Sequence, residues 1–121
     1  MKLIEKKIIS SNKSFTSYRS TTPCLDESWH VHAEVELIYI LEGSGLRFIG
    51  DDVQAFKGGE LALIGSKLPH LWRNSPDYYQ NLGLKSDVLV VQFREDFLAA
   101  EACRKILDMR QWVSVRHRAV I

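Results

Sequence analysis

Short β-type segments separated by glycine turns constrain the fold of this chain more than any other feature of its sequence. Turn signals that contain glycine stand at residues 43–45, 50–52 and 57–59. Short strands at this regular spacing indicate an antiparallel sandwich or barrel. The sequence predicts strands over residues 3–9, 14–20, 30–42, 46–50, 53–56, 60–65, 68–74 and 87–93.

One segment near the C-terminus has helical rather than alternating periodicity. Phe97, Ala100, Cys103 (or Arg104) and Leu107 recur at helical spacing, and Asp96 is a suitable N-cap. We therefore expect one helix over residues 96–110. The 121 residues contain no internal repeat and no linker, so a single domain over residues 1–121 is expected.

Charge and cysteine content exclude several classes of protein. Sixteen basic residues against fifteen acidic ones leave a net charge of +1, so the chain lacks the basic surface of a nucleic-acid-binding protein. Its apolar runs are too short to cross a membrane, and its N-terminus does not resemble a signal peptide. Two widely separated cysteines, Cys24 and Cys103, are typical of free thiols in a reducing cytoplasm. The expected location is therefore cytoplasmic, with no membrane association.

The predicted strand 30–42 carries ionisable side chains at one end of one face. Its even positions begin with His30, His32, Glu34 and Glu36, whereas its odd positions are apolar or aromatic. On a flat strand, His30 and Glu36 would lie about 20 Å apart, too far for joint metal coordination. Spacing alone therefore leaves two readings open: a metal site that needs a bent strand, or ordinary polar residues on an exposed face.

Two motifs in the sequence resemble those of the cupin superfamily. Residues 30–43 have the first motif, His-x-His, three residues, Glu, six residues and Gly, and the second supplies Gly59, His70 and Asn74. The resemblance implies a mainly β, cupin-type antiparallel barrel (a double-stranded β-helix or jelly roll) with the one C-terminal helix. It also implies a bend that brings together four metal ligands, namely His30, His32, Glu36 and His70.

The implied cofactor is a divalent metal, with Zn, Ni, Fe and Mn as candidates. The sequence departs from the cupin pattern at three positions that shape turns. Cys24 and Lys67 stand where the family has glycine, and Gly65 stands where it has proline. All four implied ligands are nevertheless retained.

A narrower resemblance covers residues 29–97. The segments "WHVHAEVELIYILEGSGLRFIGD", "GELALIGSKLPHLWRN" and "VLVVQFREDF" are similar to the N-terminal sensor domain of AraC-type transcriptional regulators. That resemblance implies a non-enzymatic domain that senses a small molecule, such as a sugar or another polar metabolite. The helix-turn-helix pair through which such regulators bind DNA is absent from this sequence, so DNA binding by this chain is not expected.

Two other functions remain open at this stage: a small metal-dependent cupin enzyme of isomerase or dioxygenase type, and a dimerisation module with a vestigial pocket. A homodimer is expected, because the apolar face of strand 30–42 needs a cover. Further candidates for ligand contact lie on predicted strands near the motifs: Trp29, Tyr39, Arg47, Trp72 and Gln92. Arg47 is included because an inward arginine can pair with an anionic ligand.

Overall fold

A computed structural model of the chain describes residues 2–9 and 15–96. The helix expected over residues 96–110 lies, apart from Asp96, outside the described residues. Within the described part, strands dominate, and the one helical element is a short 3-10 helix, η1 (Pro76–Tyr79), where the sequence predicted a polar loop.

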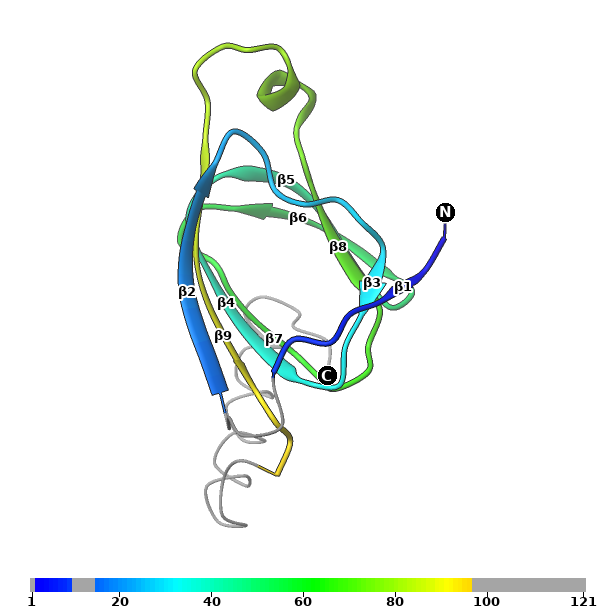
Figure 1. Cartoon of the computed structure of the whole chain (residues 1–121). Helices are drawn as coiled ribbons and strands as arrows, with labels where there is room; N and C mark the ends of the chain where they lie inside the picture. The colour runs from blue at the N-terminus through cyan, green and yellow to red at the C-terminus, as the bar shows by residue number, and fades with distance from the viewer. Residues whose placement is uncertain (1, 10–14, 97–121) are drawn as a thin grey trace.

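Two β-sheets face each other and curve into a barrel (Figure 1). The first sheet has the strand order β1 (Ile4–Glu5), β3 (His30–Val31), β8 (His70–Asn74), β5 (Ser44–Ile49) and β6 (Asp52–Lys57). The second has the order β2 (Phe15–Thr22), β9 (Ser86–Phe93), β4 (Val35–Glu42) and β7 (Leu61–Ile64). The pairings are antiparallel except that of β1 with β3. This is the expected cupin-type architecture.

The single strand predicted over residues 30–42 is in fact two strands in different sheets. Residues 32–34 form a bend between β3, in the first sheet, and β4, in the second. Beyond the bend, the even positions of β4 face the inside of the barrel and the odd positions face outward. Even positions such as Ile38 and Ile40 are buried inside the barrel, whereas Tyr39 and Leu41 point outward and are each 37% exposed.

Only one of the three predicted glycine turns closes a hairpin. Gly50 and Asp51 connect β5 to β6, and Gly50 has a φ of 58°, as a tight two-residue hairpin turn requires. The other two turns carry the chain from one sheet to the other. At the first of these crossings Gly45 packs against β8, where a Cβ would lie 2.0 Å from the carbonyl oxygen of Arg73. A side chain there would push the two strands apart.

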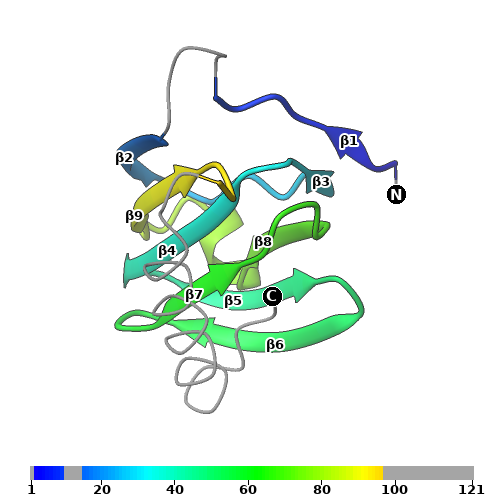
Figure 2. The same cartoon turned by 90° about the horizontal axis from the view of Figure 1, so that it is seen from below.

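The core lies between the inner faces of the two sheets. The second sheet contributes Ile38, Ile40, Val88 and Val90, together with Ala62 and Ile64 of β7. These residues pack with buried residues of the first sheet: Ile49, Phe56 and Trp72. Seen from below, the same arrangement shows β1 and the residues that follow it running past one open end of the barrel (Figure 2). The apolar core therefore fills the centre and leaves that end for polar side chains.

Asn74 ties the two sheets and a long loop together. Its Oδ1 accepts a hydrogen bond from the backbone N–H of Leu25 at 2.7 Å, and its Nδ2 donates to Ser86 Oγ at 2.7 Å and to the Ser44 carbonyl at 3.2 Å. A buried amide needs such partners, because an unsatisfied polar group inside a protein is costly. The asparagine of the second motif therefore has a structural role.

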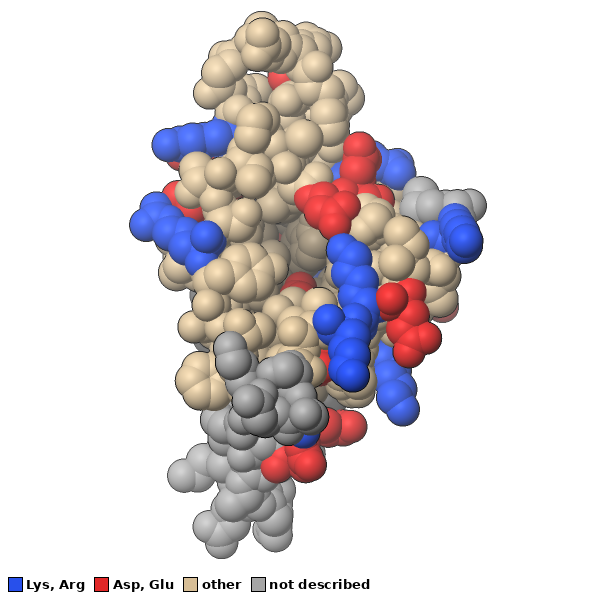
Figure 3. All heavy atoms as spheres, viewed as in Figure 1, with Lys and Arg blue, Asp and Glu red and all other residues tan. Residues whose placement is uncertain are grey.

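On the face drawn in Figure 3, basic and acidic side chains are interspersed, as the net charge of +1 leads one to expect. Across residues 2–9 and 15–96, no helix has the length and apolar character needed to cross a lipid bilayer.

Candidate functional site

Four ionisable side chains converge inside the barrel near its open end. His30 on β3 and His70 on β8 are directly paired across the first sheet. His32 lies in the bend that follows β3, and Glu36 is the second residue of β4 in the opposite sheet. The bend thus removes the separation of about 20 Å that a flat strand would impose on His30 and Glu36.

The distances among these groups are short. Ligand atoms of His30, His32 and His70 lie within 4.8 Å of one another. Glu36 faces two of these rings, with Oε1 3.4 Å from His32 Nε2 and Oε2 3.8 Å from His70 Nε2. Of these four residues, His32, Glu36 and His70 are buried, and His30 is half-buried.

Backbone carbonyl groups orient all three imidazoles in the same way. The Nδ1 atoms lie 2.8 Å from the Ser28 carbonyl for His30, 3.0 Å from the Glu34 carbonyl for His32, and 2.7 Å from the Leu68 carbonyl for His70. A carbonyl only accepts hydrogen bonds, so each Nδ1 carries a proton, and in the neutral ring Nε2 then presents a lone pair. This is the tautomer and support that metal-binding histidines commonly have.

Glu36 is held by a neighbouring strand. Gln92 on β9 donates a hydrogen bond from Nε2 to Glu36 Oε1 at 2.8 Å, and both side chains are buried. Burial would raise the pKa of Glu36, but the contacts with His32, His70 and Gln92 lower it below its usual value. The carboxylate is therefore ionised at neutral pH.

Burial also sets the protonation of the histidines. Desolvation is the largest effect on His70 and lowers its pKa from 6.5 to about 4. Desolvation lowers the pKa of His30 as well. Burial opposes protonation of His32 too, but its contacts with Glu36 raise its pKa above the usual value. At neutral pH, His30 and His70 are therefore neutral, which is the form that binds a metal.

These residues fit a divalent metal ion. The Nε2 atoms of His32 and His70 are buried without a hydrogen-bond partner, an arrangement that is unfavourable unless something else binds there. Two nitrogen ligands of one zinc ion lie at most about 4.2 Å apart, so small movements of the rings would allow shared coordination. Three imidazoles and one carboxylate suit Zn, Ni, Fe or Mn.

A cavity of about 170 Å³ adjoins this group inside the barrel. At roughly 30 Å³ per water molecule, it has the volume of about five or six water molecules and can admit part or all of a small ligand. Its walls combine His30, His32 and Glu36 with apolar side chains of the core, among them Ile38, Val88 and Val90.

The structure separates the five candidate ligand-contact residues into two groups. Trp72 and Gln92 line the cavity, and the indole Nε1 of Trp72 is a buried donor with no hydrogen-bond acceptor. The other three lie elsewhere. Tyr39 points outward from β4, and Trp29 is not among the lining residues. Arg47 is buried but does not line this cavity; it lines a separate small space together with Glu60.

Sequence reasoning missed several residues at the mouth of the cavity. Tyr18 on β2 lines it, and burial and the nearby Glu36 raise the pKa of Tyr18. Lys6 and Asp26 also line it and form an ion pair, with 2.9 Å between Lys6 Nζ and Asp26 Oδ2. The only available signal was alternation in residues 14–20, which places Tyr18 and Ser20 on one face. Nothing in the sequence links Lys6 with Asp26.

Lys67 shows how the chain accommodates one departure from the cupin pattern. It stands where the family has glycine, and it adopts a φ of 59°, in the left-handed region that favours glycine. Its backbone N–H donates to the His32 carbonyl at 2.8 Å. The loop before His70 therefore keeps its shape, at a backbone cost of about 1–2 kcal/mol.

Comparisons with known proteins agree with the fold. A family model described as the AraC-like ligand binding domain matches residues 17–101. No curated protein sequence matches the chain.

Solved structures with the same fold include several cupins. A cupin protein from Bacteroides fragilis superposes with a TM-score of 0.59 at 16% identity, covering 83% of this chain and 92% of that one. The Cnp3 cupin domain from Schizosaccharomyces pombe gives 0.57 at 9% identity, covering 72% and 61%. The iron(II) form of HppE in complex with substrate gives 0.53 at 16% identity, covering 66% of this chain and 46% of that one. At these identities the likeness shows the fold alone.

Proposed function

We propose that this chain, which belongs to the family of AraC-like ligand-binding domains, is the small-molecule sensor of an AraC-type transcriptional regulator. The ligand would bind inside the barrel, beside the histidine group, and be assisted by a metal. Ligand binding would then alter the position of a DNA-binding part of the regulator. The ligand class is a small polar metabolite, a sugar being one candidate.

The observation that carries this proposal is the cavity inside the barrel, beside which several buried polar atoms lack a hydrogen-bond partner. Two residues that line it, His32 and Trp72, have a buried nitrogen without a hydrogen bond, Nε2 and Nε1 respectively. The same holds for Nε2 of His70, whose ring lies 4.2 Å from that of the lining residue His30. Buried polar groups are normally satisfied, so a metal at the imidazoles and an acceptor oxygen at the indole would complete the site. The apolar wall opposite would contact the carbon skeleton of the ligand.

In this proposal the metal is held by His30, His32, Glu36 and His70. When bound, it would supply an electrophilic centre that attracts an oxygen atom of the ligand. The surrounding protein groups would hold the metal ligands in position. Gln92 holds the Glu36 carboxylate in place, and the three backbone carbonyl groups fix the imidazole rings.

The test combines metal analysis with a ligand screen. Protein purified without an affinity tag is expected to contain one divalent ion per chain, and His32→Ala and His70→Ala are expected to lose it. Thermal shifts with a panel of sugars and small polar metabolites should then identify compounds that stabilise the wild type more than Trp72→Phe. Equal metal content in the wild type and both histidine variants would refute the metal site. A screen without any stabilising compound would refute the sensor.

A second function, a small metal-dependent cupin enzyme, is favoured by one observation. The three histidines that could hold a metal, His30, His32 and His70, lie beside a cavity inside the barrel. The two functions differ in the fate of the bound compound. A sensor returns its ligand unchanged, whereas an enzyme of isomerase or dioxygenase type converts it. Incubating the metal-loaded protein with each stabilising compound, followed by mass spectrometry and NMR, distinguishes them.

A further inference from the structure

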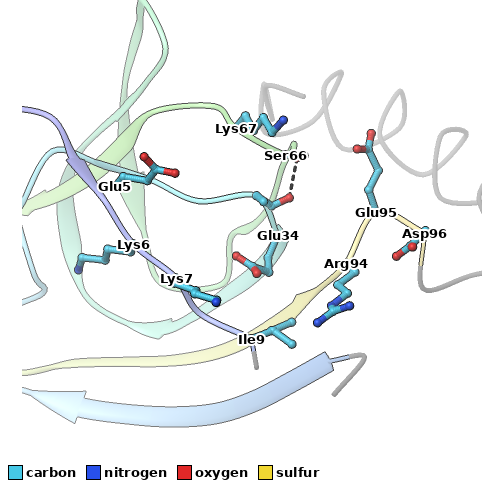
Figure 4. A pocket seen from close by; sticks show the side chains of 11 residues that line it. Glu5, Lys6, Lys7, Ile9, Glu34, Ser66, Lys67, Arg94, Glu95 and Asp96 are labelled. Atoms are coloured by element: carbon cyan, nitrogen blue, oxygen red, sulfur yellow. Dashed lines mark hydrogen bonds between the residues drawn. The ribbon is translucent and has the colours of Figure 1, made fainter. Parts of the chain in front are cut away.

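A second hollow lies outside the barrel, next to the bend between β3 and β4. It is a groove of about 760 Å³ between the N-terminal segment, the bend and the end of β9 (Figure 4). Charged side chains of both signs line it, including Lys7, Glu34, Lys67 and Glu95. The proposed sensor site does not use this groove, because none of these four residues lines the barrel cavity.

Glu34 is the unusual residue of this groove. Its side chain is only 9% exposed, and its Oε1 atom is buried without a hydrogen-bond partner. The nearest cationic candidate, His32 Nδ1, lies 3.9 Å from this oxygen and already bonds to the Glu34 carbonyl at 3.0 Å. Figure 4 shows the Glu34 side chain projecting into the groove, with Lys7 and Lys67 on its borders. An unbonded buried carboxylate oxygen is costly, so it indicates a missing donor.

The backbone around Glu34 is held in place on two sides. Ser66 Oγ donates to the Ala33 carbonyl, as Figure 4 shows, and the Lys67 N–H donates to the His32 carbonyl at 2.8 Å. These two bonds join the bend to the loop before β8. The carboxylate is therefore presented by a fixed part of the structure.

The charges around the groove define the chemistry of the missing donor. The described residues contain no cluster of metal-ligating groups that includes Glu34, which argues against a metal ion. An organic ammonium group can donate to Glu34 Oε1 and neutralise its charge. The groove is lined by four basic and four acidic side chains, so a molecule that carries both an ammonium group and an anionic group matches its charges.

We propose that this groove is a second ligand site, which binds a small zwitterion with its ammonium group on Glu34 and its anionic group towards Lys7 and Lys67. The ligand class is a compound of amino-acid type. None of the four proposed metal ligands lines this groove, so its occupation does not require a metal.

The test uses β-alanine as the probe and ¹⁵N-labelled full-length chain, treated with a chelator. Addition of β-alanine should shift the backbone amide signals of residues 33, 34, 66 and 67. Propionate carries only the anionic group of the probe and propylammonium only its ammonium group, so each should bind more weakly than β-alanine. Glu34→Gln should weaken β-alanine binding by about tenfold or more, the loss expected for one hydrogen bond to a charged group. Glu42→Gln, an exposed glutamate on β4, is the matched control and should not change the binding.

Lys7→Gln keeps the test decisive if Glu34→Gln does not fold, because Lys7 is exposed. This variant should weaken binding of β-alanine but not of propylammonium. Absence of shifts in the wild type, shifts confined to another face, or equal binding by the wild type and both groove variants would overturn the proposal.

Discussion

Replacement of His70 by glutamine should make the free energy of unfolding of the metal-free protein much less sensitive to acid pH. Burial lowers the pKa of His70 from 6.5 to about 4, and the side chain is 1% exposed. Between these two pH values, the unfolded chain binds a proton at this residue and the folded chain does not. The stability that depends on neutral His70 is therefore complete above pH 6.5 and is lost as the pH falls towards 4.

The size of this effect follows from the pKa difference. Each pH unit within the window corresponds to about 1.4 kcal/mol, so acidification from pH 6.5 to 5 removes about 2 kcal/mol of the free energy of unfolding. His30, whose pKa is also lowered, acts in the same direction, and His32, whose pKa is raised, acts in the opposite one. Both residues remain in His70→Gln, so the difference between the two proteins reports the titration of His70 together with its electrostatic coupling to His30, His32 and Glu36.

The assay is urea unfolding of chelator-treated wild type and His70→Gln at about pH 7 and pH 5. We expect the stability difference between the two pH values to be smaller in the variant by about 2 kcal/mol. The comparison uses differences between pH values, so a general destabilisation of the variant does not affect it. An NMR titration of the His70 ring gives a direct check. The same pH difference in both proteins, or a ring that titrates near 6.5, would refute the reasoning.

Two further substitutions test the supports of the site and the fold. Gln92→Leu removes the 2.8 Å hydrogen bond to Glu36 Oε1. It should weaken metal binding by roughly 10–100-fold in a chelator competition assay. Unchanged affinity would show that Gln92 does not position the carboxylate. Asn74→Ala removes three hydrogen bonds between the sheets and the loop at Leu25 and should cost about 3 kcal/mol in urea unfolding. A loss below about 0.5 kcal/mol, the size typical of a surface substitution, would contradict the role given to Asn74.

The strands and the types of metal ligand were predictable from the sequence because both depend on local patterns. Glycine turns and short β-type segments led to a mainly β barrel, and the structure has strands at or within every predicted position. The spacing of His30, His32, Glu36 and His70 suggested a metal site once the cupin motifs were considered. Net charge, which is a sum over residues, likewise requires no structure.

What the sequence alone could not decide was which residues face one another. Alternation in residues 30–42 is equally compatible with either face pointing inward, and only the bend at 32–34, with the pairing of β4 to β7 and β9, buries Ile38 and exposes Tyr39.

The same limit explains the remaining differences at the site. Lys6 and Asp26 lie twenty residues apart in sequence, and they meet at the cavity mouth because β1 pairs with β3. The imidazole tautomers depend on carbonyl groups whose directions are set by local backbone conformation. Residue types and periodicity are local properties of a chain, whereas contacts between strands, burial and the resulting pKa shifts depend on the whole fold.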